Sequence, residues 1–319
     1  MALPRRRISD RVVRVVPYLN FALSAIFLLS FHVYAADTLT SDNATLWERL
    51  TKGPEALEPL DKVLFAVLIL LSFELLDFFS KHSGSWFRSK LIPVRGKHLD
   101  ELTVKDQLFI GISKAATAPF VYFYLRFAYF EPNVVWDLAN LRFANTVAPL
   151  LALFIVYDFF YTILHWALHI KAIYGYIHKH HHHQKAPSRA NVDAVNVHPV
   201  EFFLGEYNHL WTLFLCTRVA QIHILGSLLF LAIGGFLAGI NHTRYDMVVS
   251  FWGVRIFDSK AHDVHHRIPQ SNYGQYTMFW DWVFQSYRAY NPNDRVNPEA
   301  QLDLKTGKSM EYGKRKKVP

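Results

Sequence analysis

The sequence predicts an all-α membrane protein: a multi-pass transmembrane helical bundle, with about four spans plus a re-entrant helical hairpin, and a cytosolic histidine-rich helical cap. Two observations lead to this prediction. Apolar residues come in long runs although 19% of the 319 residues are charged, a separation expected when lipid surrounds part of a chain. Histidines gather in three short runs, the first at the end of an apolar run and the other two between or after the apolar runs.

The apolar runs set the expected spans. Residues 18–35, 64–79, 108–130 and 147–170 are each expected to cross the bilayer as a helix. Residues 210–240 are also apolar, but Arg218, Gln221 and Gly226 interrupt them. We expect this stretch to form two half-helices that dip into the membrane and return.

The charge distribution orients these spans. The chain has a net charge of +8, and its basic residues lie mostly between apolar runs and at the ends, as the positive-inside rule describes. No basic stripe alternates with aromatic residues, which argues against a nucleic-acid partner. An even number of crossings places both termini and all three histidine runs in the cytosol. Lys316 and Lys317 near the end resemble a dilysine retrieval signal, which predicts the endoplasmic reticulum membrane.

The three histidine runs predict a metal site. Within each run the imidazoles lie three or four residues apart, a spacing that stacks side chains on one helix face. Helical turns from different elements can then close a cage of nitrogen ligands, which suits iron, copper and zinc. The single cysteine, Cys216, leaves no thiolate site. The predicted ligands are His165 and His169; His178, His181 and His182; and His262, His265 and His266. His180 and His183 are expected to point away, to solvent or into hydrogen bonds.

Four further residues are candidates for the same site. His242 lies four residues before Asp246, so we expect the histidine to bind metal, whereas Asp246 could be a ligand or a hydrogen-bond partner of one. The same two roles are open for His198. Asp158 lies two helical turns before His165 and is expected to accept a hydrogen bond from a ligating imidazole.

Taken in order, these motifs resemble those of the fatty acid hydroxylase and sterol desaturase superfamily of integral membrane di-iron oxygenases. The resemblance covers roughly residues 157–287. The matching motifs are Asp158 with His165-x3-His169, His178-x2-His181-His182, His198-Pro-Val-Glu201, Asn241-His242, His262-x2-His265-His266, Asn272-Tyr-Gly274, Trp280-Asp281 and Ser286-Tyr287. The chain departs from the pattern at Trp166, where an arginine is frequent, and at Asp246, where some members have histidine.

The resemblance implies a lipid oxidase with two iron ions, dioxygen as oxidant, and electrons from NAD(P)H through cytochrome b5 and its reductase. We expect hydroxylation of a fatty acyl chain, sphingolipid or sterol, with desaturation or methyl oxidation as variants of the same chemistry. Three segments are predicted: a membrane-anchoring region (1–145) with about three spans, a catalytic domain (146–290) and a polar cytosolic tail (291–319). The alternative is a membrane metal transporter with a histidine-rich cytosolic loop, which would place ligands midway through several spans.

Overall fold

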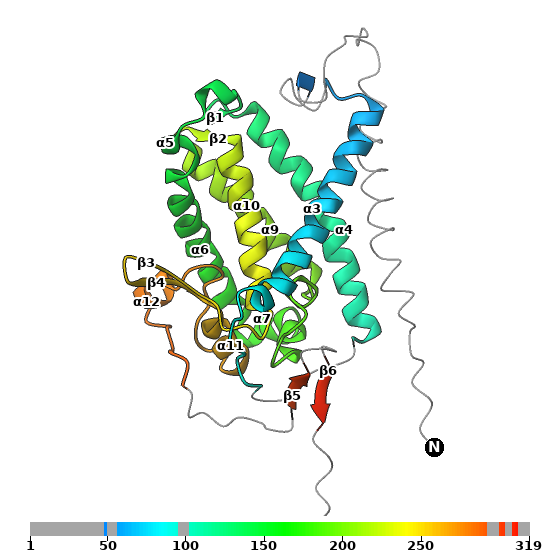
Figure 1. Cartoon of the computed structure of the whole chain (residues 1–319), viewed down its shortest axis with the longest axis vertical. Helices are drawn as coiled ribbons and strands as arrows, with labels where there is room; N and C mark the ends of the chain where they lie inside the picture. Colours follow the sequence, from blue (N-terminus) through cyan, green and yellow to red (C-terminus); the bar gives the residue numbers. More distant parts are fainter. Residues whose placement is uncertain (1–47, 50–55, 95–101, 292–299, 304–307, 312–319) are drawn as a thin grey trace, which may run out of the picture.

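A computed structural model describes residues 48–49, 56–94, 102–291, 300–303 and 308–311, and these are mostly helical (Figure 1). The predicted span at 18–35, the two lysines at 316 and 317, and most of the predicted polar tail lie outside the described residues. Of the tail, the structure describes two short antiparallel strands, β5 (Ala300–Asp303) and β6 (Lys308–Glu311).

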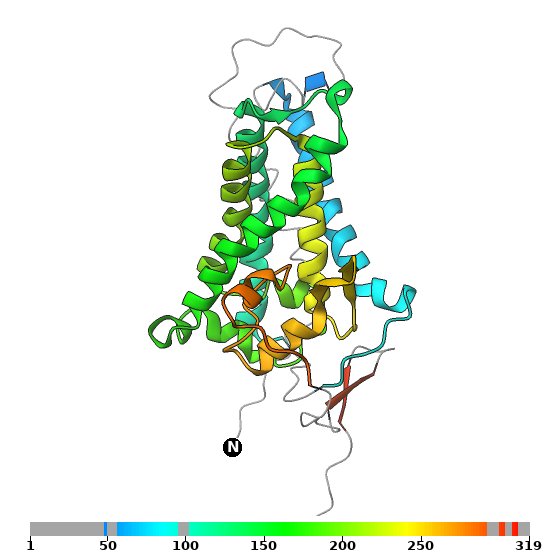
Figure 2. The same cartoon turned by 90° about the vertical axis from the view of Figure 1, so that its left-hand side faces the viewer.

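Five long helices form an elongated bundle (Figures 1 and 2). They are α3 (Pro59–Trp86), α4 (Val104–Phe130), α6 (Ala148–Leu168, preceded by the short α5, Phe143–Thr146), α9 (Pro199–Thr217) and α10 (Ile224–Asn241). Helix α10 packs against α3 and α6, and α9 packs against α6 and α4. Within the described residues, α3, α4, α5 with α6, and α10 are long and apolar enough to cross a membrane. The predicted membrane helical bundle is therefore confirmed.

Local sequence explains where the first two of these helices begin and what they bury. Helices α3 and α4 both start with capping boxes, in which the carboxylates of Asp61 and Asp106 accept hydrogen bonds from the backbone N–H of the N-cap residue three positions earlier. Leucines on α3 remain about half exposed, as expected for a surface that faces lipid rather than water. The buried core between the helices includes Tyr124, Leu153 and Phe230.

The apolar stretch 210–240 corrects one prediction. Instead of two half-helices, the chain forms α9 and α10, of 19 and 18 residues, and of the two only α10 is apolar enough as well as long enough to cross. Helix α9 begins eleven residues before the apolar run. The apolar pattern does not reveal this first half, because buried polar side chains such as Glu201 and Asn208 interrupt it. The predicted return still holds, since His198 at the start of α9 and His242 at the end of α10 lie at the same end of the bundle.

The two ends of the bundle differ. At the far end, β1 (Val134–Val135) pairs with β2 (Ile222–His223), next to the 3₁₀ helix η3 (Leu138–Asn140). The other end, at the bottom of Figure 2, carries a set of short elements. These are α7 (Lys171–Tyr174), the 3₁₀ helix η4 (His178–His183), α8 (Asn191–Ala194), the hairpin of β3 (Val248–Phe251) and β4 (Val254–Asp258), α11 (Ser259–Arg267) and α12 (Phe279–Val283). Of these short elements, η4 and α11 hold histidines.

Candidate metal centre

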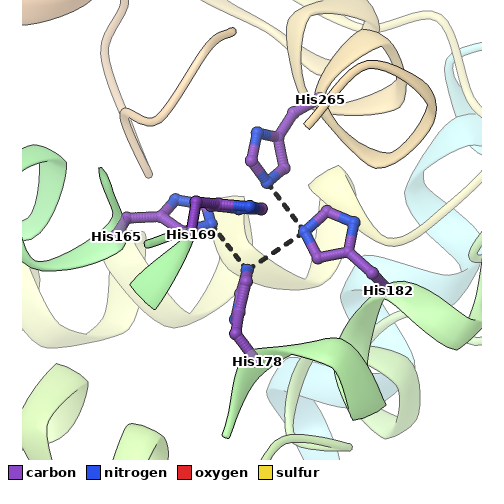
Figure 3. A group of neighbouring side chains, drawn as sticks. All are labelled: His165, His169, His178, His182 and His265. Atoms are coloured by element: carbon purple, nitrogen blue, oxygen red, sulfur yellow. Dashed lines mark hydrogen bonds between the residues drawn. The ribbon is translucent and has the colours of Figure 1, made fainter. Parts of the chain in front are cut away.

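Nine histidines converge in two groups at this end of the bundle. The first group contains His165, His169, His178, His182 and His265, and the second contains His181, His242, His262 and His266. Within each group, one nitrogen from every ring lies within 4.8 Å of the others. Figure 3 shows the five rings of the first group, from three separate segments, pointing toward a common centre. All nine residues predicted as metal ligands are thus brought together, and His169 alone among them is not buried.

Helical spacing assigns the rings to the two groups. The pairs separated by four residues stay together: His165 with His169, His178 with His182, and His262 with His266. The remaining histidine of a run contributes to the opposite group, as His181 and His265 do. Each histidine run after the first therefore serves both groups. His180 and His183 point elsewhere as predicted, His180 toward Asn196 and Asp106, and His183 to the exterior.

The hydrogen bonds at Nδ1 fix which nitrogen faces each group. The Nδ1–H of His242 donates to the carbonyl of Ala238 (2.8 Å), and that of His181 donates to the carbonyl of Asn196 (3.4 Å). A carbonyl only accepts, so both Nε2 atoms carry lone pairs. These two lone pairs nevertheless face each other across 3.2 Å. Such an approach is repulsive in isolation and favourable around a shared cation.

The spacing of the nitrogens also fits a metal ion. Successive Nε2 atoms are 3.0 Å apart from His165 to His178, 3.0 Å from His178 to His182, and 3.1 Å from His182 to His265. Metal–nitrogen bonds of about 2.1 Å that meet at right angles place neighbouring donors about 3 Å apart. The buried Nε2 of His169 has no hydrogen-bond partner among the residues that the structure describes, which is unusual for a polar atom unless it binds something else. The donor set therefore fits two transition-metal ions.

Burial keeps these imidazoles in the form that binds metal. The pKa values of His178, His265 and His266 lie well below the ordinary value for histidine. The main cause of the low pKa is desolvation, and repulsion from neighbouring rings is the second. The pKa values of His181 and His262 are lowered for the same reasons. The rings are neutral at pH 7, and the neutral imidazole is the metal ligand.

A layer of acceptors behind the histidines holds their orientation. Besides the carbonyls already named, Tyr273, Ser271 and Gln184 accept from the Nδ1–H of His165, His265 and His266 respectively. The one carboxylate in this layer is Glu201, whose Oε1 lies 2.7 Å from Nδ1 of His178. Sequence reasoning noted Glu201 only as part of a motif. Its role depends on α9 passing behind η4, which the histidine spacing does not reveal.

Asp158 is buried close to the site, but its predicted role was wrong in detail. Its carboxylate accepts from the backbone N–H groups of Gln275 (3.2 Å), Tyr276 (3.1 Å) and Thr277 (2.5 Å) rather than from an imidazole. The physical reason is that the backbone N–H groups of residues 275–277 all lie within hydrogen-bonding distance of this carboxylate. Because this segment follows Tyr273, whose carbonyl orients His165, Asp158 acts on the site through the backbone.

The structure places His198 and Asp246 outside both groups. His198 is the N-cap of α9, where its Nδ1 accepts from the backbone N–H of Val200. The Asp246 carboxylate pairs with the ammonium group of Lys260 at 2.9 Å. Neither side chain is among the converging nitrogens or their acceptors described above, so the geometry favours neither of the two roles left open for them.

A cavity of about 180 Å³ lies between α3, α4, α6, α9 and α10. Its walls are mainly apolar and aromatic, with Phe73, Phe120, Tyr161 and Phe202 among them. None of the nine histidines lines it, but it reaches Glu201, the residue that contacts His178. An apolar space inside a membrane bundle, one residue away from the first group, suits a hydrophobic ligand.

Comparison with known proteins identifies the central segment. Residues 150–286 match the model of the family described as fatty acid hydroxylase. The chain is 30% identical over 166 residues to methylsterol monooxygenase 1 of Rattus norvegicus, covering 50% of this chain and 54% of that protein. It is 31% identical over 127 residues to Delta(7)-sterol-C5(6)-desaturase of Nicotiana tabacum, covering 39% and 44%. The matches thus span about half the length of these relatives. No solved structure matches significantly.

Proposed function

We propose that this chain, which belongs to the fatty acid hydroxylase family through residues 150–286, is a membrane-bound oxidoreductase that uses dioxygen and external electrons to oxidise a lipid. The observation that carries the proposal is the convergence of nine imidazole nitrogens in groups of five and four beside an apolar cavity. Two iron ions held by these groups would supply dioxygen activation and hydrogen abstraction from an unactivated carbon–hydrogen bond.

The residues of the chain would do the remaining work. Backbone carbonyls and Glu201 behind the rings would hold six of the nine imidazoles in the tautomer that points Nε2 inward, namely those of His165, His178, His181, His242, His265 and His266. The cavity would hold the lipid with the carbon to be oxidised beside the first group. The relatives are named for reactions on sterols, so a sterol is the favoured substrate class. Hydroxylation is the expected reaction, and desaturation or methyl oxidation would differ only in how the substrate lies.

The electrons would come from NAD(P)H through cytochrome b5 and its reductase, since the sequence has no nucleotide-binding glycine motif of its own. A chain of net charge +8 suits an acidic electron carrier. The location that fits this supply is the endoplasmic reticulum membrane, with the histidine end and both termini in the cytosol.

Reconstitution in nanodiscs with sterol, cytochrome b5, its reductase and NADPH tests the proposal. The wild-type protein should consume dioxygen and form an oxidised sterol, measured by mass spectrometry. His181→Ala and His265→Ala should each abolish product, because each removes a nitrogen from one group. His183→Ala is the matched control, since this exposed histidine of η4 belongs to neither group, and it should keep the activity. Full activity in the first two variants would overturn the site assignment.

The metal-transporter alternative fits the geometry less well. A transport path needs ligands midway along several spans, whereas the nine histidines lie together at one end of the bundle. Across the described ranges, no other set of three or more histidine, cysteine or acidic side chains has metal-binding geometry. The arrangement therefore favours a fixed metal centre.

A further inference from the structure

The β3–β4 hairpin carries an unusual amount of exposed apolar surface. Strand β3 is exposed along its whole length, so no described element covers it. Trp252, at the tip, is 91% exposed, the largest value among the exposed large apolar side chains of the described residues. Four further large apolar side chains of the hairpin are each at least 43% exposed, namely Val248, Val249, Phe251 and Val254, whereas Phe257 near its base is buried. Such a patch on a protein surface marks a contact with something apolar.

The turn of the hairpin is built to present this tip. Trp252 and Gly253 both have positive φ angles, +47° and +76°, as in the two-residue turns that match strand twist. A tryptophan is an uncommon residue at positive φ. A two-stranded ribbon is also marginal in water on its own, and Phe257 is the one large apolar side chain of this hairpin that is buried. The chain therefore tolerates an unfavourable backbone position at Trp252 while exposing most of the large apolar side chains of the hairpin.

The position of the hairpin indicates what covers it. Both views place β3 and β4 level with the lower part of α6, rather than beyond the end of the bundle (Figures 1 and 2). Other exposed aromatic side chains flank the same end of α6, namely Trp166 on α6 itself and Trp282 on α12, which packs against α6. Tryptophans concentrate where a membrane protein crosses the lipid–water boundary. The apolar surface of the hairpin thus continues that of the spans.

We propose that the β3–β4 hairpin is a membrane anchor whose tip, Phe251 and Trp252, inserts among lipid acyl chains beneath the headgroups on the histidine side of the bilayer. The partner is the lipid surface itself, and the inference does not depend on the proposed enzymatic activity. Experiments can therefore test membrane anchoring by the hairpin and the enzymatic activity separately.

The anchor also holds one of the histidine helices. Strand β4 ends at Asp258, whose carboxylate caps α11 by accepting from the N–H of Lys260 at 2.9 Å. The next residue, Ser259, donates to the carbonyl of Tyr245 at 2.7 Å, just before β3. No loop separates the hairpin from α11, which carries His262, His265 and His266. Lipid contact at the tip therefore fixes the start of the helix that contributes to both histidine groups.

A spin label at Trp252→Cys tests the insertion in the full-length protein in phosphatidylcholine nanodiscs. The only native cysteine, Cys216, is buried, so a maleimide or methanethiosulfonate label reports the new site. We expect faster collision with dissolved oxygen than with a water-soluble nickel chelate. Gln270→Cys, in the exposed turn after α11, is the control and should show the reverse. Equal accessibility of the two sites would overturn the proposal, as would dipolar broadening showing that the label contacts a second copy of the chain.

A paired variant tests the link to α11. Phe251→Ser with Trp252→Ser removes the apolar tip without touching the cap at Asp258. Hydrogen exchange of the folded protein in nanodiscs should become faster across residues 259–267, while α9 is unchanged. Faster exchange confined to residues 248–258 would contradict the claim that the anchor holds α11.

Discussion

At the residue scale, the partner of each Nδ1 decides what a histidine can do. His165, His242 and His265 each donate from Nδ1 to a backbone carbonyl, so Nε2 is left as the inward-facing donor of electrons. These carbonyls come from turns and helix ends, where no intrahelical N–H occupies them. The sequence motifs identify which histidines converge, whereas the surrounding backbone carbonyls determine which ring nitrogen faces inward.

The Glu201–His178 contact gives a first prediction. Glu201→Ala removes the acceptor of the Nδ1–H of His178, so the ring loses its fixed orientation. We expect metal affinity and activity to fall by about 10- to 100-fold. Glu201→Gln keeps an oxygen acceptor and should retain most of both. Metal titration of the two purified variants, followed by the reconstituted assay, measures the difference. Equal losses in Gln and Ala would show that charge, not orientation, matters.

His198 gives a second prediction, because its role was open on sequence grounds. As the N-cap of α9, outside both groups, it should be dispensable for metal. His198→Ala is expected to cost about 1 kcal/mol of stability through the lost cap, with metal content unchanged. His178→Ala, in the same region, should lose metal. Thermal unfolding and elemental analysis of both variants decide this, and metal loss in His198→Ala would make it a ligand after all.

Predictability at this scale has a clear limit. The spacing of three and four residues within the three runs identified eight of the nine converging histidines, because that spacing is a local property of a helical turn. His242 was a separate candidate, from its spacing to Asp246, which does not join either group. The spacing could not show that His181 and His265 contribute to the group opposite their neighbours, since this depends on how η4 and α11 face each other. Asp158 failed for a similar reason: its partners are backbone amides of residues 275–277, which carry no side-chain signal.

At the element scale, close helix approach positions the site. Gly226 of α10 lies against the backbone of Thr146, where an added Cβ would be 2.6 Å from the carbonyl oxygen. Gly239 of the same helix lies against Ser80 of α3. These contacts fix the height of α10, and so of His242 at its end, relative to α6 and α3. The sequence predicts an interruption of the apolar stretch at Gly226 rather than a point of close packing.

A matched pair on α10 tests this packing. Gly226→Ala should be destabilising by about 1–3 kcal/mol, because the neighbour it meets is backbone and cannot move aside. Gly235→Ala meets only a flexible leucine side chain at 3.5 Å and should be tolerated. The melting temperatures of the two variants in the same detergent make the comparison. Equal melting temperatures would mean that α10 is held less tightly than the structure indicates.

At the scale of the whole molecule, the two ends of the helical bundle carry different elements. The histidines, the β3–β4 hairpin and α11 lie at one end, and η3 with the β1–β2 pair lies at the other (Figure 1). The apolar runs predicted this separation, because each span carries the chain to the opposite side. The sequence did not reveal that α9 and α10 are both of full length, since buried polar residues disguise the first half of α9.

Orientation in the membrane follows as a prediction. In sealed microsomes with the cytosolic face outward, a membrane-impermeant maleimide should label Gln270→Cys at the histidine end. Leu138→Cys, in η3 at the far end and 52% exposed, should be labelled only after the membrane is permeabilised. Labelling of both positions in intact vesicles, or of Leu138→Cys alone, would contradict a cytosolic histidine end.

The central claim is that the two histidine groups are two metal sites, and metal stoichiometry tests it most directly. Elemental analysis of the purified, folded protein should find two iron ions per chain, falling to one or fewer in His265→Ala and in His262→Ala, which each lose a nitrogen from a different group. A wild-type protein that oxidises lipid with one metal ion per chain, or with none, would contradict the account.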